Sequence, residues 1–307
     1  MLVKPRKLYY GDTIGVIAPG GPPDTDRLKS GIELLEELGF SVVAGASLAQ
    51  RRGYLAGEDR DRAAELMAMF EDPGIDAIFC ARGGTGSGRL LPYLDFEKLS
   101  PHPKIFVGYS DVTCLQLAFH QQMHWCSFYG PMVAVDLVAK TNSDIRAESV
   151  WFQMLTGQGP GHEVIQGKSL FPGSATGPLV GGCLSLIQSL CGSSYFPDLD
   201  GAILFLEEVN EEPYRIDRML THLKLCHHFE NLAGVLVGEL KDCHPKDDEP
   251  SLSIEQILAD HFGPLEIPLI MDLPFGHGTG HQVLPIGVRA EMNGQEGYYR
   301  LLEKAVS

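Results

Sequence analysis

The chain has 307 residues, of which 44% are hydrophobic and 21% are charged, a composition typical of a globular protein with a sizeable apolar core. Its 24 lysines and arginines stand against 40 aspartates and glutamates, which gives a net charge of −16 at pH 7. This balance argues against nucleic acid or anionic lipid as a partner bound through a general basic surface, and the length favours about two domains.

Signals for export and membrane insertion are weak in this sequence. No stretch approaches the ~20 apolar residues of a membrane span, and the first residues lack the roughly 7–15-residue apolar run of a secretory signal. The seven cysteines are odd in number and dispersed along the chain, which fits a reducing compartment better than a disulfide framework. We therefore expect a cytoplasmic protein without a membrane partner.

Short apolar runs alternate with helical periodicity in the first half of the chain. Strands are predicted at residues 13–18, 40–46, 75–80 and 104–109, and helices at residues 27–39, 59–72 and 110–122. This alternation predicts an α/β fold in which helices flank a mostly parallel sheet. In such sheets, ligands bind at the carboxyl ends of the strands.

The alternation breaks in a segment rich in glycine and proline, and we expect a linker or crossover at residues 156–177. The predicted domains are therefore residues 1–155 and residues 178–307. The second domain begins with GGCLSLIQSL and continues with an apolar strand at 201–209 and a helix at 213–226. Further apolar runs near the end of the chain predict a smaller, strand-rich α/β domain.

A serine stands between the predicted strand at 104–109 and the helix that follows it. In Gly108-Tyr109-Ser110-Asp111, a sharp strand-to-helix turn would present the serine hydroxyl above the sheet, next to backbone N–H groups able to bind an oxyanion. However, Val112 replaces the second glycine of a G-x-S-x-G turn, and serine is a common helix cap. Local pattern alone therefore favours a cap over a nucleophile.

Two glutamates, Glu207 and Glu208, close the apolar strand at 201–209, where α/β enzymes place catalytic side chains. Neighbouring strand residues point to opposite faces, so we expect only one of the two to face a site, and the spacing does not say which. His277 lies in the glycine-rich segment FGHGTGHQ. Loops often carry function, but a single loop histidine is more often simply solvated.

Two glycine-rich segments follow predicted strands in the first domain. The segment from Arg82 to Gly86 can bring backbone N–H groups close to a substrate oxygen; the alternative is a loop whose glycines serve only the turn geometry. APGGPP lacks the glycine order and the lysine of a nucleotide-binding loop, so we expect no nucleotide cofactor. Histidines next to Cys226 and Cys243 match none of the usual zinc spacings, and we expect no metal site.

Several motifs in fixed order give the chain a specific resemblance. They are GDTIGVIAPGG, ARGGTGSGRLLPYLD, VGYSDVT, YGPM, GGCLSLIQSL, ILFLEEVNEEPYRIDRML and FGHGTGHQVLPIG. Together they make the chain resemble the LD-carboxypeptidase family of serine peptidases, which also contains the microcin C immunity peptidases. The resemblance covers nearly the whole chain and implies a first domain of flavodoxin-like or class I amidotransferase-like type.

The resemblance implies a Ser–Glu–His triad at the domain interface. By motif, Ser110 is the nucleophile, Glu207 the acid and His277 the base. The oxyanion hole would be formed by the backbone N–H of Asp111 together with a glycine of the ARGG segment.

That glycine is Gly83 or Gly84 by motif. Arg82 and Arg89 are candidates for binding substrate carboxylates, although a salt-bridge role is at least as common for such residues. Cys183 stands where many relatives carry asparagine, which leaves the contribution of its turn to the site open.

The implied activity is removal of the terminal D-alanine from murein tetrapeptide during cytoplasmic recycling of cell-wall peptides, by a homodimer that needs no cofactor. One alternative is a related amidase that hydrolyses a peptidyl-nucleotide antibiotic. Another is a non-catalytic muropeptide-binding protein, which would not need all three of Ser110, Glu207 and His277.

Overall fold

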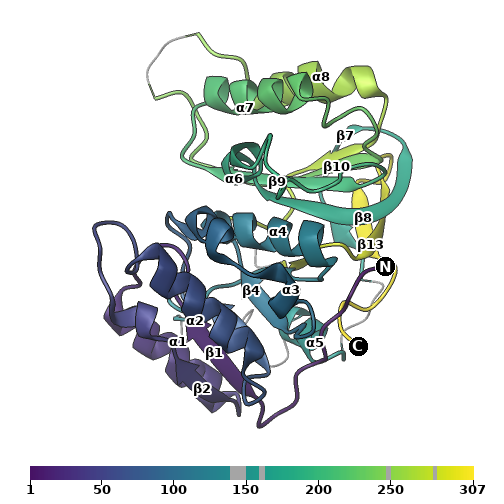
Figure 1. Ribbon diagram of the computed structural model, residues 1–307. Helices are drawn as coiled ribbons and strands as arrows, with labels where there is room; N and C mark the ends of the chain where they lie inside the picture. The colour runs from purple at the N-terminus through teal and green to yellow at the C-terminus, as the bar shows by residue number, and fades with distance from the viewer. Residues whose placement is uncertain (139–149, 159–162, 247–249, 279–281) are drawn as a thin grey trace. The chain divides into compact units, whose positions relative to one another are not determined.

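The computed structural model describes the whole chain except residues 139–149, 159–162, 247–249 and 279–281. The chain forms two compact units, each built around its own sheet (Figure 1). Unit 1 comprises Met1–Pro160, His281–Ile286 and Lys304–Ser307, and unit 2 comprises Gly161–Gly280 and Gly287–Glu303. Among the described residues, no helix is long and apolar enough to cross a membrane.

Unit 1 contains a six-stranded sheet in the order β12-β5-β4-β3-β1-β2. Its strands are β1 (Thr13–Ile17), β2 (Ser41–Ala44), β3 (Ala77–Cys80), β4 (Ile105–Gly108), β5 (Phe128–Tyr129) and β12 (Leu284–Pro285). All neighbouring strands are parallel except the pair β12 and β5. The central strands β3 and β4 are buried along their whole length, as expected for a sheet covered on both faces. The predicted mostly parallel sheet is confirmed.

The helical segments of unit 1 connect these strands. They are α1 (Thr25–Glu37), α2 (Asp59–Glu71), α3 (Phe96–Leu99), α4 (Thr113–Met123) and α5 (Val150–Leu155), with 3-10 turns η1 (Ala46–Ala49), η2 (Ser87–Tyr93) and η3 (Ser110–Val112). Helix α1 begins after Asp24, whose carboxylate accepts hydrogen bonds from the N–H groups of Asp26 and Arg27. Helix α4 is almost entirely buried and follows β4 through η3, so the chain turns sharply at Ser110.

Unit 2 contains an eight-stranded mixed sheet in the order β6-β14-β13-β8-β9-β10-β11-β7. Its strands are β6 (Ile165–Gln166), β7 (Lys168–Phe171), β8 (Ser174–Cys183), β9 (Ile203–Val209), β10 (Gly234–Lys241), β11 (Leu269–Met271), β13 (Arg289–Asn293) and β14 (Tyr298–Leu301). The four strands from β8 to β11 are parallel, and the outer strands are antiparallel. The predicted strand-rich second half is therefore confirmed.

Helices α6 (Leu184–Ser189), α7 (Pro213–Leu225) and α8 (Ile254–Phe262), followed by η5 (Gly263–Leu265), complete unit 2. Helix α7 packs against both α6 and α8, and Figure 1 shows α7 and α8 side by side over one face of the sheet. Helix α8 starts at a capping box in which the Ser253 hydroxyl and the Gln256 side chain each bind the other residue's backbone N–H.

The glycine- and proline-rich stretch at 156–177, predicted to be a linker or crossover, contains β6, β7 and the start of β8. The strands β6 and β7 are the two edges of the sheet, where polar and glycine-rich sequences are tolerated because one side of the strand has no partner. Such strands lack the apolar alternation by which the sequence reveals the central ones.

Candidate active site

Ser110 occupies the sharp turn between β4 and α4 in unit 1. Its φ of 64° lies in the left-handed region, which costs a residue with a side chain roughly 1–2 kcal/mol. The Ser110 N–H donates to the hydroxyl of Tyr129, 3.2 Å away, at the end of the neighbouring strand β5. A serine held in strained backbone at the carboxyl end of a parallel strand is typical of a nucleophile turn.

Asp111 ties this turn to the glycine-rich segment that follows β3. Its buried carboxylate accepts the N–H groups of Gly86 at 3.1 Å and Ser87 at 2.8 Å, while the Ser87 hydroxyl donates to the Asp111 carbonyl. Burial raises the pKa of the Asp111 carboxyl above its usual value. The side chain is therefore structural, which leaves the Asp111 backbone N–H as the group available to the predicted oxyanion hole.

The predicted oxyanion glycines differ in their surroundings. A Cβ atom built on Gly83 would lie 3.1 Å from the Ser110 hydroxyl oxygen and 3.3 Å from the Asp111 nitrogen. A Cβ atom on Gly84, whose φ is +92°, would instead meet Gly21, 3.2 Å away. Unit 1 thus brings Ser110, Asp111 and Gly83 together, and the absence of a side chain at Gly83 keeps space beside the serine.

The two candidate arginines have different partners. The Arg89 guanidinium forms an ion pair with Asp59, with Nη2 2.7 Å from Oδ2 and Nε 3.0 Å from both carboxylate oxygens. The hydrogen bond from Arg89 lowers the pKa of Asp59 below its usual value. Arg82 donates to the carbonyl of Pro22 at 3.2 Å. Arg89 is therefore engaged in the kind of salt bridge that the sequence left open as its alternative role.

In unit 2, Glu207 and His277 form a direct pair. The Glu207 Oε2 atom lies 2.7 Å from His277 Nδ1 and also accepts the His277 backbone N–H at 3.1 Å. Glu207 is fully buried, while the His277 side chain is 17% exposed. Because a carboxylate only accepts, the bond places a proton on Nδ1, so the neutral ring carries its lone pair on Nε2. This is the tautomer that a general base needs.

Gly276 makes this pair possible. Its φ is +110°, and a Cβ atom there would lie 2.6 Å from Glu207 Oε2, closer than packing allows. The segment after β11 can approach the end of β9 only because this position has no side chain.

Glu208 points to the other side of β9. Its carboxylate accepts the N–H of Ser185 at 2.7 Å and of Val209 at 2.9 Å, and the Cys183 thiol lies 3.4 Å from Oε1. Burial raises the pKa of Glu208, and burial also raises the pKa of the Cys183 thiol well above its ordinary value. Of the two glutamates, therefore, Glu207 is the one that contacts His277. Cys183 instead lies next to the carboxylate of Glu208.

Tyr129 and Gly276 are site residues that sequence reasoning did not single out. Tyr129 ends β5, which lies beside β4 in the sheet, so its position next to Ser110 follows from strand order. A signal was present in the YGPM motif, but its role depends on knowing that β4 and β5 are neighbours. Gly276 directly precedes His277, and only the packing against Glu207 distinguishes it from an ordinary turn glycine.

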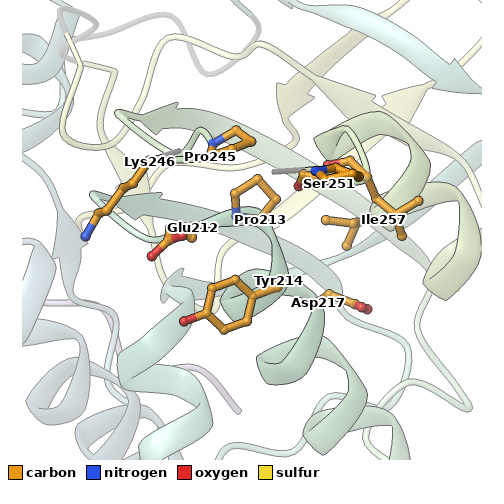
Figure 2. Close-up of a pocket in the computed structure, with 10 residues that line it drawn as sticks. Glu212, Pro213, Tyr214, Asp217, Pro245, Lys246, Ser251 and Ile257 are labelled. Atoms are coloured by element: carbon orange, nitrogen blue, oxygen red, sulfur yellow. Dashed lines mark hydrogen bonds between the residues drawn. The ribbon is translucent and has the colours of Figure 1, made fainter. Parts of the chain in front are cut away.

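A pocket of about 290 Å³ in unit 2 lies at the start of α7 and is lined by none of these residues (Figure 2). Its walls are Glu212, Pro213, Tyr214, Asp217, Pro245, Lys246, Pro250, Ser251, Leu252 and Ile257. Its lining lacks a nucleophile paired with a base, so the chemistry of this chain is better sought at Ser110 and at the Glu207–His277 pair.

Comparison with known proteins gives consistent matches over both units. Residues 14–130 match the family model described as LD-carboxypeptidase N-terminal domain, and residues 176–292 match the LD-carboxypeptidase C-terminal domain. A protein of Bacillus subtilis named probable murein peptide carboxypeptidase is 40% identical, with 95% of this chain and 92% of that protein covered. Murein tetrapeptide carboxypeptidase of Pseudomonas aeruginosa is 32% identical (92% and 93% covered). Microcin C7 self-immunity protein MccF of Escherichia coli is 28% identical (92% and 90% covered).

Solved structures share the fold. The structure of MccF in complex with glutamyl sulfamoyl guanosine superimposes with a TM-score of 0.89 at 24% identity and 99% coverage of both chains. The crystal structure of muramoyltetrapeptide carboxypeptidase from Oxalobacter formigenes gives a TM-score of 0.84 at 29% identity, covering 94% of this chain and 97% of the other.

Proposed function

The chain belongs to the LD-carboxypeptidase family and is a carboxypeptidase-like hydrolase, and from this we propose that it releases the terminal D-alanine of murein tetrapeptide by serine catalysis. The observation that carries the proposal is the Glu207–His277 hydrogen bond of 2.7 Å, together with a serine in a left-handed strand-to-helix turn. The names of the relatives from Bacillus subtilis and Pseudomonas aeruginosa support murein peptides as the substrate class.

In the proposed reaction, Ser110 attacks the carbonyl carbon of the bond before D-alanine. His277 accepts the hydroxyl proton at Nε2 and donates it to the leaving amine, and Glu207 orients the ring and stabilises the imidazolium. Water then attacks the acyl-enzyme with His277 again as the base, which regenerates the serine. The proton transfers and bond changes of these steps balance with the three side chains and one water molecule.

Backbone N–H groups of Asp111 and Gly83 are proposed to bind the oxyanion of the tetrahedral intermediate. One donor of this kind typically lowers the barrier by about 2.7–4 kcal/mol. Arg82, next to Gly83 in the chain, is the proposed partner of a substrate carboxylate, because Arg89 is already paired with Asp59. An acidic protein needs such a local cation to bind a substrate that carries carboxylates.

A second candidate function is hydrolysis of a peptidyl-nucleotide, supported by the similarity to the self-immunity protein MccF over 92% of this chain. It would use the same triad and differ in the residues that bind the leaving group of the substrate.

As part of the main proposal, the protein acts in the cytoplasmic recycling of cell-wall peptides and forms a homodimer. A non-catalytic murein binder is disfavoured, because binding alone does not require the buried Glu207 beneath His277.

The test is a mass-spectrometric assay of the purified chain with murein tetrapeptide, run beside Ser110→Ala. We expect the wild type to convert the tetrapeptide to tripeptide and alanine, while Ser110→Ala leaves it intact. Equal release in both samples would contradict Ser110 as the nucleophile. Cleavage of a peptidyl-sulfamoyl-nucleoside in place of the tetrapeptide would favour the second function, and no cleavage of either would support binding alone.

A further inference from the structure

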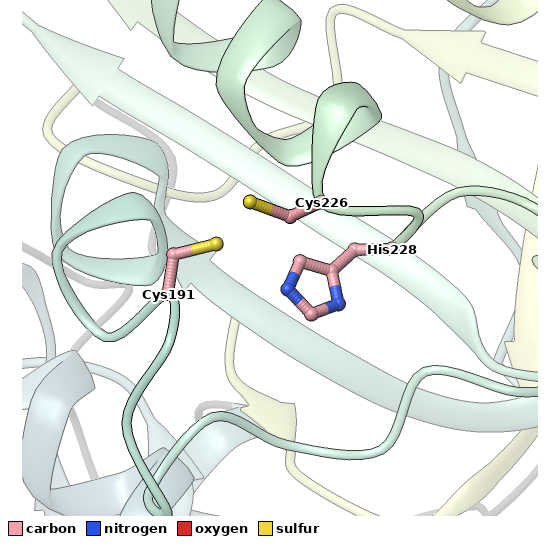
Figure 3. Close-up of side chains that lie close together, drawn as sticks. All are labelled: Cys191, Cys226 and His228. Carbon is pink, nitrogen blue, oxygen red and sulfur yellow. The ribbon is translucent and has the colours of Figure 1, made fainter.

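Two of the seven cysteines reach solvent, and these two lie side by side. Cys80, Cys114, Cys126, Cys183 and Cys243 are buried, whereas Cys191 is partly exposed and Cys226 is exposed. Figure 3 shows their thiols pointing toward one another, with the His228 ring next to them. One ligand atom from each of the three residues lies within 4.8 Å of the other two.

The local backbone holds the two segments in this arrangement. Cys191 lies in the turn after α6, where its N–H donates to the Gln188 carbonyl at 3.1 Å. Cys226 is the cap residue directly after α7, and its N–H donates to the His222 carbonyl at 3.1 Å. His227 adopts a left-handed φ of 63°, which terminates the helix and turns the chain back. His228 can therefore lie on the same side as Cys226.

The His228 ring is fixed by a stacking contact. Its centroid lies 3.7 Å from that of Phe196, with an angle of 21° between the planes. An immobilised ring loses less conformational freedom when it binds a ligand. The cluster is therefore largely formed before any ion arrives, and because α6 packs against α7, it bridges two contacting elements.

The ligand types define which ions fit. Two sulfur atoms and an imidazole nitrogen form a soft donor set, which selects Zn²⁺ or Cu⁺ over Mg²⁺ and Ca²⁺. In a tetrahedral zinc site with Zn–S bonds of about 2.3 Å and Zn–N bonds of about 2.0–2.1 Å, ligand atoms stand roughly 3.5–3.8 Å apart. The separations within 4.8 Å need only small side-chain rotations to reach this geometry.

We propose that Cys191, Cys226 and His228 form a Zn²⁺-binding site in unit 2, distinct from the Ser110 and Glu207–His277 residues, with water as the fourth ligand. Two thiolates would neutralise the charge of the ion. Burial and the neighbouring Cys226 raise the pKa of Cys191 to about 11, so binding releases protons. Burial lowers the pKa of His228 below its ordinary value.

This site is not visible in the amino-acid sequence. Only His227 separates Cys226 from His228 in the chain, but their partner Cys191 comes from a distant turn, so no zinc spacing is visible. Histidines next to Cys226 and Cys243 predict no metal site, because the third ligand lies far away in the sequence.

The proposal is tested by titrating the reduced full chain with Zn²⁺ in competition with a chromogenic chelator. We expect one Zn²⁺ per chain, and at least a 100-fold higher Kd in Cys191→Ser, Cys226→Ser and His228→Asn. His227→Asn and Cys243→Ser are matched controls, since neither residue belongs to the cluster, and should change Kd by less than three-fold. Wild-type protein that binds no Zn²⁺, or controls that lose binding as much as the ligand variants, would overturn the site.

Co²⁺ provides a second readout that does not depend on affinity. The wild type should show a thiolate-to-cobalt charge-transfer band, and this band should weaken when either cysteine is replaced and the variant remains folded by circular dichroism. Bound Co²⁺ without such a band would place the metal elsewhere and contradict the proposal.

Discussion

At Ser110, the backbone conformation and the proposed chemistry favour different residues. Its left-handed φ of 64° favours glycine, yet the proposed reaction needs a hydroxyl at this position. The surrounding hydrogen bonds, including that from the Ser110 N–H to Tyr129, hold the turn against this cost. Strain of this kind commonly marks functional positions.

Replacing Ser110 by glycine or by alanine separates strain from chemistry. Both variants lack the hydroxyl, but only alanine keeps the unfavourable conformation, so we expect Ser110→Gly to be more stable than Ser110→Ala by about 1 kcal/mol. Urea unfolding of the two proteins measures the difference. At Lys29, an exposed site within helix α1, the order should reverse, because glycine is worse than alanine there. Equal stability of the two Ser110 variants would contradict a strained turn.

At this scale, the sequence predicted the residue types of the site better than their contacts. The spacing around Glu207 and Glu208 shows that they face opposite ways, but the choice between them depends on where the His277 segment passes. That path is set by Gly276, whose role appears only in packing against Glu207. The ion pair of Arg89 with Asp59 likewise joins residues from η2 and α2 that no local pattern connects.

At the scale of elements, strand β9 divides its last side chains between two environments. Glu207 meets the segment that carries His277, and Glu208 accepts the Ser185 N–H at the start of α6. The alternation of a strand thus supplies one carboxylate to the proposed site and another to the anchoring of α6. Both carboxyl groups are buried, so a negative charge on either one lowers the folding stability unless hydrogen bonds or a cation compensate it.

Glu208 should make folding stability depend on pH. Its pKa is raised by burial above the ordinary value of 4.5, so the folded chain holds the proton more tightly than the unfolded chain. The stabilisation is complete below pH 4.5 and is lost as the pH rises through the folded-state pKa. Glu208→Gln keeps a neutral side chain, so its stability relative to wild type should increase over that rise.

Urea unfolding of both proteins at a series of pH values measures this difference, with the exposed Glu296→Gln as the control. If the unfolding free energy of Glu208→Gln minus that of wild type stays constant or falls as the pH rises, Glu208 does not carry the raised pKa.

The central elements were predictable because burial on both faces gives strands a continuous apolar run. The predicted strands at 13–18, 75–80 and 104–109 correspond to β1, β3 and β4 with small changes at their ends. Strands β6 and β7 were missed, because edge strands rich in glycine carry no such run. A strand as short as β12 has no sequence pattern of its own, and it is recognised only by its pairing with β5.

At the scale of the whole molecule, unit 1 is completed by residues from the end of the chain. Leu284 and Pro285 of β12 pair with β5, and Ser307 exchanges backbone hydrogen bonds with Pro5 and Lys7. The predicted domains are consecutive segments of the chain, because nothing in these short returning pieces indicates which sheet they join. Unit 1 is therefore discontinuous in sequence.

We expect the returning C-terminal residues to stabilise unit 1. Val306 is 5% exposed, so Val306→Ala should lower the unfolding free energy by about 1–2 kcal/mol. Val43→Ala removes the same atoms at a position that is 43% exposed, and should cost less than about 0.5 kcal/mol. Both tryptophans, Trp125 and Trp151, fall within unit 1, so tryptophan fluorescence in urea follows this unit. Equal effects of the two substitutions would contradict a structural role for the returning segment.

The most direct test of the proposed site measures D-alanine release from murein tetrapeptide by Ser110→Ala, Glu207→Gln and Glu208→Gln side by side. We predict that kcat falls at least about 10³-fold in Ser110→Ala and on the order of 10²–10⁴-fold in Glu207→Gln, because the imidazole loses its negative partner. Glu208→Gln, which keeps one side-chain oxygen able to accept the Ser185 N–H, should stay within about ten-fold of wild type. Activity retained in Ser110→Ala, or lost in Glu208→Gln while Glu207→Gln remains active, would contradict the account.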